Sequence, residues 1–186
     1  MWRSPGGRQV RLVGHAAVFN SHSVDLGGFY ETITPGAFAR TLRDGHPIFA
    51  VHHHNMADLL GSSQSRTLKL SEDSEGLHFD LTLPDSSLGR DIHELVQRGD
   101  LNKMSFCFLV NGSAGEAWHE DSNGQIIRTL KDVTLIEVST VARPAYPASS
   151  VAARSTPAIH QAPRRNKNAM LKRYMTARLE ASCAAP

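Results

Sequence analysis

Three places in the chain hold side chains whose types suit nucleophilic chemistry. They are the run His52-His53-His54, Ser105 in the apolar stretch MSFCFLV, and Glu137 in the stretch VTLIEVSTV. A serine hydroxyl is a weak nucleophile until a base removes its proton, and imidazole is the commonest such base. A carboxylate that accepts a hydrogen bond from the ring fixes which ring nitrogen is basic. These residue types match a serine hydrolase, but spacing along the chain alone does not bring them together.

The histidine run has two other interpretations. In a strand, His52 and His54 would lie on one face and His53 on the other, so the run could offer two metal ligands from one side. A zinc ion would then need a distant carboxylate as a further ligand. Alternatively, the three rings form a solvated or internally hydrogen-bonded cluster without a chemical role.

Glu137 is notable because it interrupts an apolar run. Strand alternation predicts that its side chain shares a face with three others. These are Val133, Leu135 and Ser139. A carboxylate in the middle of such a strand is partly desolvated and needs a partner. Ser105, by contrast, also fits an ordinary position on the polar face of a strand.

The segments that must position these side chains are mostly strands. Alternating apolar residues predict strands within residues 9–19, 76–84, 104–112 and 133–147, among others. Helical spacing predicts two short helices, one after the pair Pro35-Gly36 and one within residues 86–100. The sum is a mostly-β (β+α) domain of about six or seven strands with two short helices. A closed or nearly closed β-barrel is the simplest such architecture.

Charge divides the chain into two parts. Residues 154–186 hold seven basic residues and one acidic residue, a net charge of +6, so the total of +2 leaves −4 for residues 1–153. The stretch SVAARSTPAIHQAPRRNKN is typical of a linker, and AMLKRYMTARLEA after it has the composition of a short basic helix. We therefore expect one folded domain over residues 1–152 and a basic Pro/Ala-rich linker with a short helical tail over residues 153–186.

Composition excludes several other classes of protein. The longest uncharged apolar run is only a few residues, and the start MWRSPGGRQV lacks the apolar core of a secretory signal, so we expect an intracellular protein without a membrane-spanning helix. Two cysteines do not make a disulfide framework. Aromatic residues are only 6% of the chain and the body is acidic, so a nucleic-acid-binding protein would have to use the basic tail alone.

Six sequence blocks, in order from about Val10 to Val151, resemble the prohead maturation proteases of tailed bacteriophages and prophages. The blocks are GHAAVFN, FYETITPGAFARTL, HHHNMADLLG, LSEDSEGLHFDLTLP, the MSF block and LIEVSTVARPAYP. That family is similar in fold to the herpesvirus assemblin proteases, a β-barrel ringed by helices. The alternative is a non-catalytic capsid-assembly or scaffold protein that keeps the fold, and the retention of all three candidate residues argues against it.

The resemblance implies a role for each candidate residue. In the family, a His followed by Asn or Asp, and a few residues later by Leu-Gly, supplies the general base, and His54 matches that spacing. The serine that follows Met is the nucleophile, which implies Ser105, and Cys107 on the same predicted strand face stays as an alternative. The acidic residue of the family's Glu-Val-Ser block corresponds to Glu137, and the resemblance implies that it takes the place of the third-position His of the viral triad. Arg143, or a backbone N–H near Ser105, would stabilise the oxyanion.

The implied function is that of a serine endopeptidase with a Ser/His/Glu triad and with no cofactor or metal. Its expected substrates are the major capsid protein, the scaffold (as a domain or a separate protein) and the protease itself, during prohead maturation. The assemblin resemblance implies a homodimer. The expected location is the bacterial host cytoplasm, inside the immature phage prohead, with no membrane partner.

Overall fold

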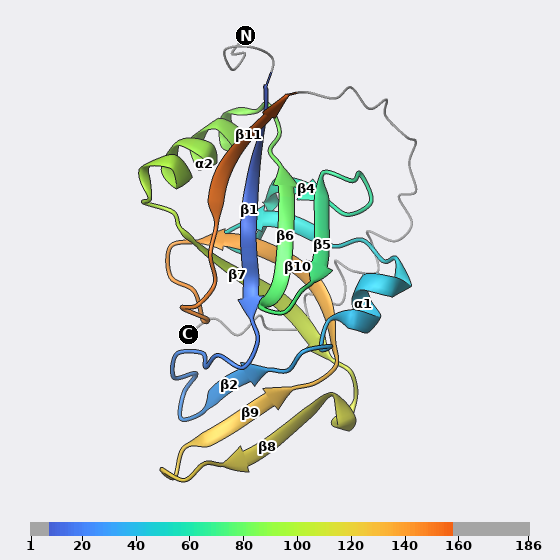
Figure 1. The fold of residues 1–186 in the computed structure, drawn as a ribbon, viewed down its shortest axis with the longest axis vertical. Coiled ribbons are helices and arrows are strands. Elements are labelled where there is room, and N and C mark those ends of the chain that lie inside the picture. Colours follow the sequence, from blue (N-terminus) through green and yellow to red (C-terminus); the bar gives the residue numbers. More distant parts are fainter. Residues whose placement is uncertain (1–7, 158–186) are drawn as a thin grey trace.

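Residues 8–157 are described by a computed structural model, and they form eleven strands, two α-helices and one 3₁₀ helix (Figure 1). The mostly-β character predicted from alternation is therefore confirmed, with more strands than the six or seven expected. No helix in this part of the chain is long and apolar enough to cross a membrane.

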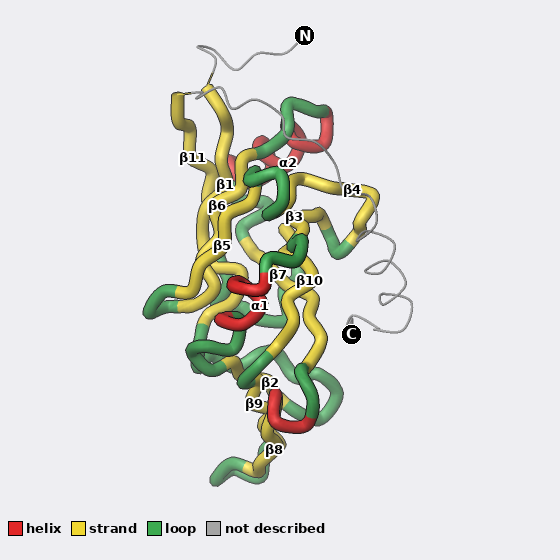
Figure 2. The backbone as a smooth tube through the Cα atoms, turned by 90° about the vertical axis from the view of Figure 1, so that its right-hand side faces the viewer, coloured by secondary structure: helices red, strands yellow, loops and turns green. Residues whose placement is uncertain are grey.

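The strands form three sheets. The first has the order β11 (Ala152–Pro157), β1 (Arg8–Val18), β6 (Gly76–Thr82) and β5 (Leu68–Glu72), all antiparallel. The second has the order β4 (Asn55–Ser62), β3 (Phe49–His52), β10 (Val133–Val141) and β7 (Lys103–Val110), in which only β3 and β10 are parallel. The third has the order β2 (Tyr30–Ile33), β9 (Ile126–Leu130) and β8 (Glu116–Glu120), and it lies at one end of the molecule (Figures 1 and 2).

Both predicted helices are present. They are α1 (Ala39–Asp44) and α2 (Ser87–Arg98), and the 3₁₀ helix η1 (Ser113–Gly115) precedes β8. Helix α2 begins where the Ser86 hydroxyl accepts a hydrogen bond from the Gly89 N–H at 3.1 Å. It ends at Gly99, whose φ of 82° is a left-handed conformation that glycine adopts without strain.

One hydrophobic core lies between the first two sheets. Its largest fully buried side chains include Leu12 and Phe79 from the first sheet and Met104 from the second. On β7 the alternation is as predicted, because Phe106 and Phe108 belong to or pack against this core while Ser105 does not. The second sheet therefore presents β7 and β10 with one face to the core and the opposite face available for a site.

The predicted closed barrel is not confirmed, because no sheet within residues 8–157 closes on itself. Strands β1 and β7 lie close together but share no hydrogen-bonded ladder. Instead, the segment 142–151, between β10 and β11, forms backbone hydrogen bonds both to β1 and to the residue before β7. Ser150 N–H donates to the carbonyl of His15 in β1 at 2.9 Å, and Val151 N–H donates to the carbonyl of Asn102, next to β7, at 3.3 Å. This segment thus occupies the position in which a barrel-closing ladder would form.

Strand β11 begins at Ala152, the expected last residue of the folded domain, and continues to Pro157. Its residues pair with β1 in an antiparallel ladder, with Arg154 opposite Arg11. The first residues of the predicted linker are therefore an edge strand, whose backbone pairing needs no apolar alternation. The predicted short helix at the end of the chain lies outside the described residues.

Candidate active site

Glu137 occupies a position that a β-bulge creates. The ladder between β10 and β7 shifts between Leu135, which pairs with Phe108, and Glu137, which pairs with Cys107. Because of this extra residue, Leu135 points into the core while Glu137 points to the opposite face. The prediction that Leu135 and Glu137 share a face was therefore wrong. The carboxylate is only 3% exposed, as its place in an apolar strand predicted.

The histidine run is not a continuous strand. Strand β3 ends at His52, and the next two residues are left-handed, with φ of 48° for His53 and 58° for His54. This conformation costs non-glycine residues about 1–2 kcal/mol each, so neighbouring contacts must hold it. One such contact is the hydrogen bond from His53 N–H to the Thr140 carbonyl at 3.0 Å. The expectation of two histidines on one strand face is thereby corrected.

His54 and Glu137 form the central pair of the site. The ring nitrogen Nδ1 of His54 lies 2.5 Å from Oε1 of Glu137. Since a carboxylate oxygen accepts, Nδ1 carries the proton in this pair and Nε2 is the basic nitrogen. The second carboxylate oxygen, Oε2, accepts a hydrogen bond from the Ser139 hydroxyl at 2.7 Å.

Ser105 lies on the same face of the sheet as this pair. In the antiparallel ladder of β7 and β10 it is directly opposite Ser139, whose hydroxyl also accepts from His54 N–H at 2.9 Å. Ser105 is 7% exposed, and within residues 8–157 its hydroxyl forms no hydrogen bond with an imidazole. Bonds between a nucleophile and its base often tighten only when substrate is bound. The sheet therefore brings the three predicted residues to one face, with His54 and Glu137 already in contact.

The other two histidines differ from His54 in their partners. His52 Nδ1 lies 2.9 Å from the Thr140 hydroxyl. Thr140 is opposite the core residue Met104 in the ladder, so it lies on the core side of the sheet and not on the side of Glu137. Partial burial, and then the charge of the adjacent His53 ring, lower the pKa of His52. Of the three rings, only that of His54 is paired with Glu137.

Arg143 lies in the segment that follows β10. Its side chain is exposed and forms no ion pair with residues 8–157. The same segment is hydrogen-bonded to β7, the strand that carries Ser105. Lys103 Nζ donates to the carbonyls of Pro147 at 2.6 Å and Ser149 at 3.2 Å. The fully buried Ser149 hydroxyl donates to the Met104 carbonyl at 2.6 Å and accepts from Met104 N–H at 3.1 Å.

The middle of this segment is anchored to the third sheet through Tyr146. Its hydroxyl donates to Oε1 of the buried Glu31, and Arg128 donates to Oε2 of Glu31 at 2.9 Å. Burial raises the pKa of Glu31, and burial followed by the Glu31 charge raises the pKa of Tyr146 well above its ordinary value. Arg143 therefore belongs to a segment that is hydrogen-bonded both to β7 and to Glu31 of the third sheet.

The sequence placed Ser139 on the face of Glu137 without a role, and it predicted nothing for Ser149 or Lys103. Ser139 stands two residues after Glu137, so it shares the face of that carboxylate, and this spacing was a usable signal. Nothing in the local pattern marks Ser149 or Lys103, because their partners are backbone atoms 44 to 46 residues away.

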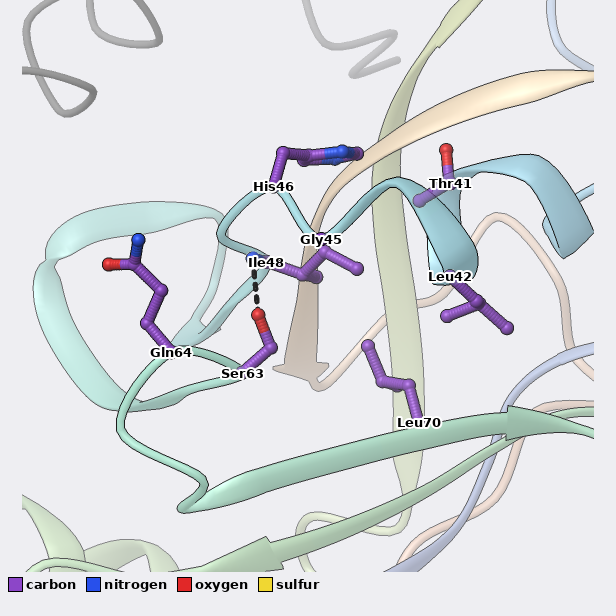
Figure 3. A pocket seen from close by; sticks show the side chains of 8 residues that line it. All are labelled: Thr41, Leu42, Gly45, His46, Ile48, Ser63, Gln64 and Leu70. Atoms are coloured by element: carbon purple, nitrogen blue, oxygen red, sulfur yellow. Dashed lines mark hydrogen bonds between the residues drawn. The ribbon is translucent and has the colours of Figure 1, made fainter.

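A separate cavity of about 190 Å³ lies between α1 and the turn that joins β4 to β5 (Figure 3). His46, Ile48 and Ser63 are among its lining residues, and Ser63 Oγ accepts a hydrogen bond from Ile48 N–H at 2.9 Å. Its lining includes neither Ser105 nor His54. Within residues 8–157, no three His, Cys, Asp or Glu side chains are arranged to hold a metal ion.

Comparison with one solved structure agrees with the β-rich fold. The structure of the KSHV protease in complex with a hexapeptide phosphonate inhibitor has a TM-score of 0.50 and 12% sequence identity, over 78% of this chain and 65% of that one. The varicella-zoster virus protease has a TM-score of 0.47 and 13% identity, over 77% of this chain and 63% of that one. This chain therefore spans less than two thirds of the length of either herpesvirus protease, and the likeness to the KSHV enzyme is one of fold.

No curated protein sequence is significantly similar to the chain. A family model does match, and it covers most of the sequence. This model, described as caudovirus prohead serine protease, matches residues 2–162, a range that includes all three residues of the site. The chain therefore belongs to the caudovirus prohead serine protease family.

Proposed function

We propose that this protein is a serine endopeptidase of prohead maturation in which Ser105 is the nucleophile, His54 the general base and Glu137 the residue that orients the base. The observation that carries the proposal is the 2.5 Å contact between His54 Nδ1 and the buried Glu137 carboxylate. This pair lies on the same sheet face as Ser105. A buried carboxylate on Nδ1 leaves Nε2 to act on the serine proton, which is the arrangement of a Ser-His-acid triad.

The reaction follows from these positions. Ser105 Oγ attacks the scissile carbonyl while His54 Nε2 takes the hydroxyl proton, and the same nitrogen then gives that proton to the leaving amine. Glu137 holds the ring in the productive tautomer and stabilises the imidazolium. Water then hydrolyses the acyl-enzyme by the same base, which regenerates the Ser105 hydroxyl.

The oxyanion that forms on the attacked carbonyl needs donors that are already in place. Two sources are proposed: backbone N–H groups of the strand that carries Ser105, and the exposed guanidinium of Arg143. The attachment of residues 142–151 to Met104, the residue before Ser105, supports a role for this segment beside the nucleophile.

The proposed substrates are the scaffold portion of the major capsid protein, or a separate scaffold protein, and the protease itself. Family membership supports these substrates, together with a location inside the immature prohead in the bacterial host cell. We also propose a homodimer and no cofactor or metal. A non-catalytic assembly protein with the same fold is the competing possibility.

Coexpression tests the proposed function directly. We expect the full chain, expressed with the major capsid protein and scaffold of the same phage, to convert them to shorter fragments, and mass spectrometry would identify the cleaved bonds. An assembly protein without activity would leave both substrates and the chain itself at full length, whether or not particles form. That result would overturn the proposal.

The basic tail has a separate proposed role. Residues 154–186 carry a net charge of +6 and the rest of the chain −4, so the tail would pair with acidic scaffold and recruit the protease into the shell before self-cleavage removes it. Charge pairing of this kind is screened over a Debye length of about 10 Å at 0.1 M salt.

A chain that ends at Pro157 tests this role, since truncation at Val151 would also remove strand β11. We expect it to cleave peptide substrates normally but to enter proheads poorly, measured as protease copies per purified prohead. For the full chain, binding to scaffold should weaken as salt rises. Normal packaging of the truncated chain would show that the tail has no part in recruitment.

A further inference from the structure

A closed ring of hydrogen bonds passes through a fourth residue on this face of the sheet, Ser139. Its hydroxyl donates to Glu137 Oε2 at 2.7 Å and accepts from His54 N–H at 2.9 Å. The other carboxylate oxygen, Oε1, bonds His54 Nδ1 at 2.5 Å. The ring thus runs from the backbone of His54 through Ser139 and Glu137 back to the imidazole of His54. Ser139 is fully buried, so water does not substitute for either of its bonds.

We propose that Ser139 is a positioning residue that holds both the carboxylate and the backbone of the general base; this inference rests on the proposed function. One hydroxyl supplies the two constraints that the imidazole needs. It fixes the plane of the Glu137 carboxylate by bonding the oxygen that the imidazole does not use. It also anchors the main chain of His54, from which the imidazole projects.

The backbone anchor is needed because the ladder between β3 and β10 ends just before His54. The last paired residues are His52 and Thr140, and His53 N–H still reaches the Thr140 carbonyl. The next N–H, that of His54, is bonded to the Ser139 hydroxyl instead of a main-chain carbonyl. Since His54 has a φ of 58°, loss of this bond would let the strained turn relax and move the ring.

The same bonds separate the roles of two serines that face each other. Ser139 and Ser105 are directly opposite in the ladder, and both lie on the face of Glu137. A serine hydroxyl has one proton, and that of Ser139 is directed at Glu137. Ser139 therefore supports the base, and Ser105 remains the residue from which the base takes a proton.

The substitution Ser139→Ala should lower kcat about 10–100-fold and leave KM nearly unchanged, since small displacements of a catalytic group cost about 10²-fold. Cleavage of a peptide that carries a mapped capsid site would give both constants. Ser139→Thr keeps the hydroxyl and should restore most of the lost kcat. A kcat for Ser139→Ala equal to that of the unsubstituted enzyme would overturn the proposal.

Ser23→Ala is a matched control for the loss of a buried serine. Ser23 is 5% exposed, and its hydroxyl donates to the Val24 carbonyl at 2.7 Å and accepts from Glu31 N–H at 2.8 Å. It therefore makes two bonds, as Ser139 does, but away from the site. We expect the Ser23 and Ser139 variants to lower the Tm by similar amounts, while only the Ser139 variant lowers kcat.

A double-mutant cycle separates positioning from general damage to the fold. If Ser139 acts through Glu137, the loss of kcat from Ser139→Ala should shrink severalfold in a Glu137→Gln background, because groups that act as a unit are not additive. An equal loss in both backgrounds would show that the Ser139 effect is independent of the carboxylate, and it would overturn the proposal even if the threonine variant fails to fold.

A readout without turnover distinguishes this proposal from the proposed function. In full-length protein with ¹⁵N-labelled histidine, the proton shared by His54 Nδ1 and Glu137 should give a strongly downfield resonance that Ser139→Ala shifts upfield or exposes to exchange with water. An unchanged resonance in the folded Ser139 variant would overturn the positioning role. If the unsubstituted chain cleaves no capsid protein, the proposed function fails, whereas the resonance still reports whether Ser139 positions the ring.

Discussion

Ser105→Ala is expected to give a folded chain that no longer cleaves capsid protein or itself. The loss of turnover should be on the order of 10⁴–10⁶-fold, because the members of a triad act as a unit and the residual rate comes from the oxyanion hole and binding. Ser105 is 7% exposed, and its hydroxyl forms no hydrogen bond with an imidazole within residues 8–157. The fold should therefore persist, because loss of this hydroxyl leaves the hydrogen-bonded ring of His54, Glu137 and Ser139 intact. Fragment analysis of coexpressed capsid protein and the Tm of the variant would measure both outcomes.

Two companion experiments show which side chain is the nucleophile. A fluorophosphonate should add one covalent group to the unsubstituted chain, on Ser105, and none to Ser105→Ala. Cys107→Ala tests the cysteine that the sequence offers as an alternative, since Cys107 is two residues further along β7 on the same face. Processing by the Ser105 variant at the rate of the unsubstituted chain, or loss of labelling only in the Cys107 variant, would move the nucleophile away from Ser105.

The part of the site that the sequence could predict depends on regular alternation. Strand β7 has no bulge in its central residues, so the period of two correctly placed Phe106 towards the core and Ser105 on the other face. Helix α2 was equally predictable, since Ser86 and Gly99 are ordinary signals for the start and the end of a helix. Local rules succeed here because each depends only on residues close in the chain.

The rest could not be predicted because it departs from those rules. The bulge before Glu137 is set by the pairing of β10 with β7, and no glycine marks it. His53 and His54 are left-handed without the Gly or Asn that would signal such a turn. The pair of His54 and Glu137 joins residues 83 positions apart, and only the arrangement of the second sheet brings them into contact. For these residues the family resemblance carried information that periodicity lacked.

Substitutions across the histidine run should give a steep hierarchy of activity. His54→Asn should lose about as much turnover as Ser105→Ala, since the proton acceptor is gone and asparagine tolerates the left-handed backbone at φ 58°. Glu137→Gln should lose less, about 10²–10⁴-fold, because the amide keeps the shape but no longer enforces the tautomer of the ring. Rates of peptide cleavage, measured with each variant at matched concentration, would establish the order.

The neighbouring histidines supply the controls for this hierarchy. His53→Asn places the same substitution in the same left-handed turn, and His52→Ala removes a ring bonded to Thr140 rather than to Glu137, so both should keep most activity. Treatment with a chelator should change none of the rates. Inactivation by chelator with rescue by zinc, or a loss at His52 as large as that at His54, would instead favour a metal site built from the histidine run, because two ligands from that run would then be essential.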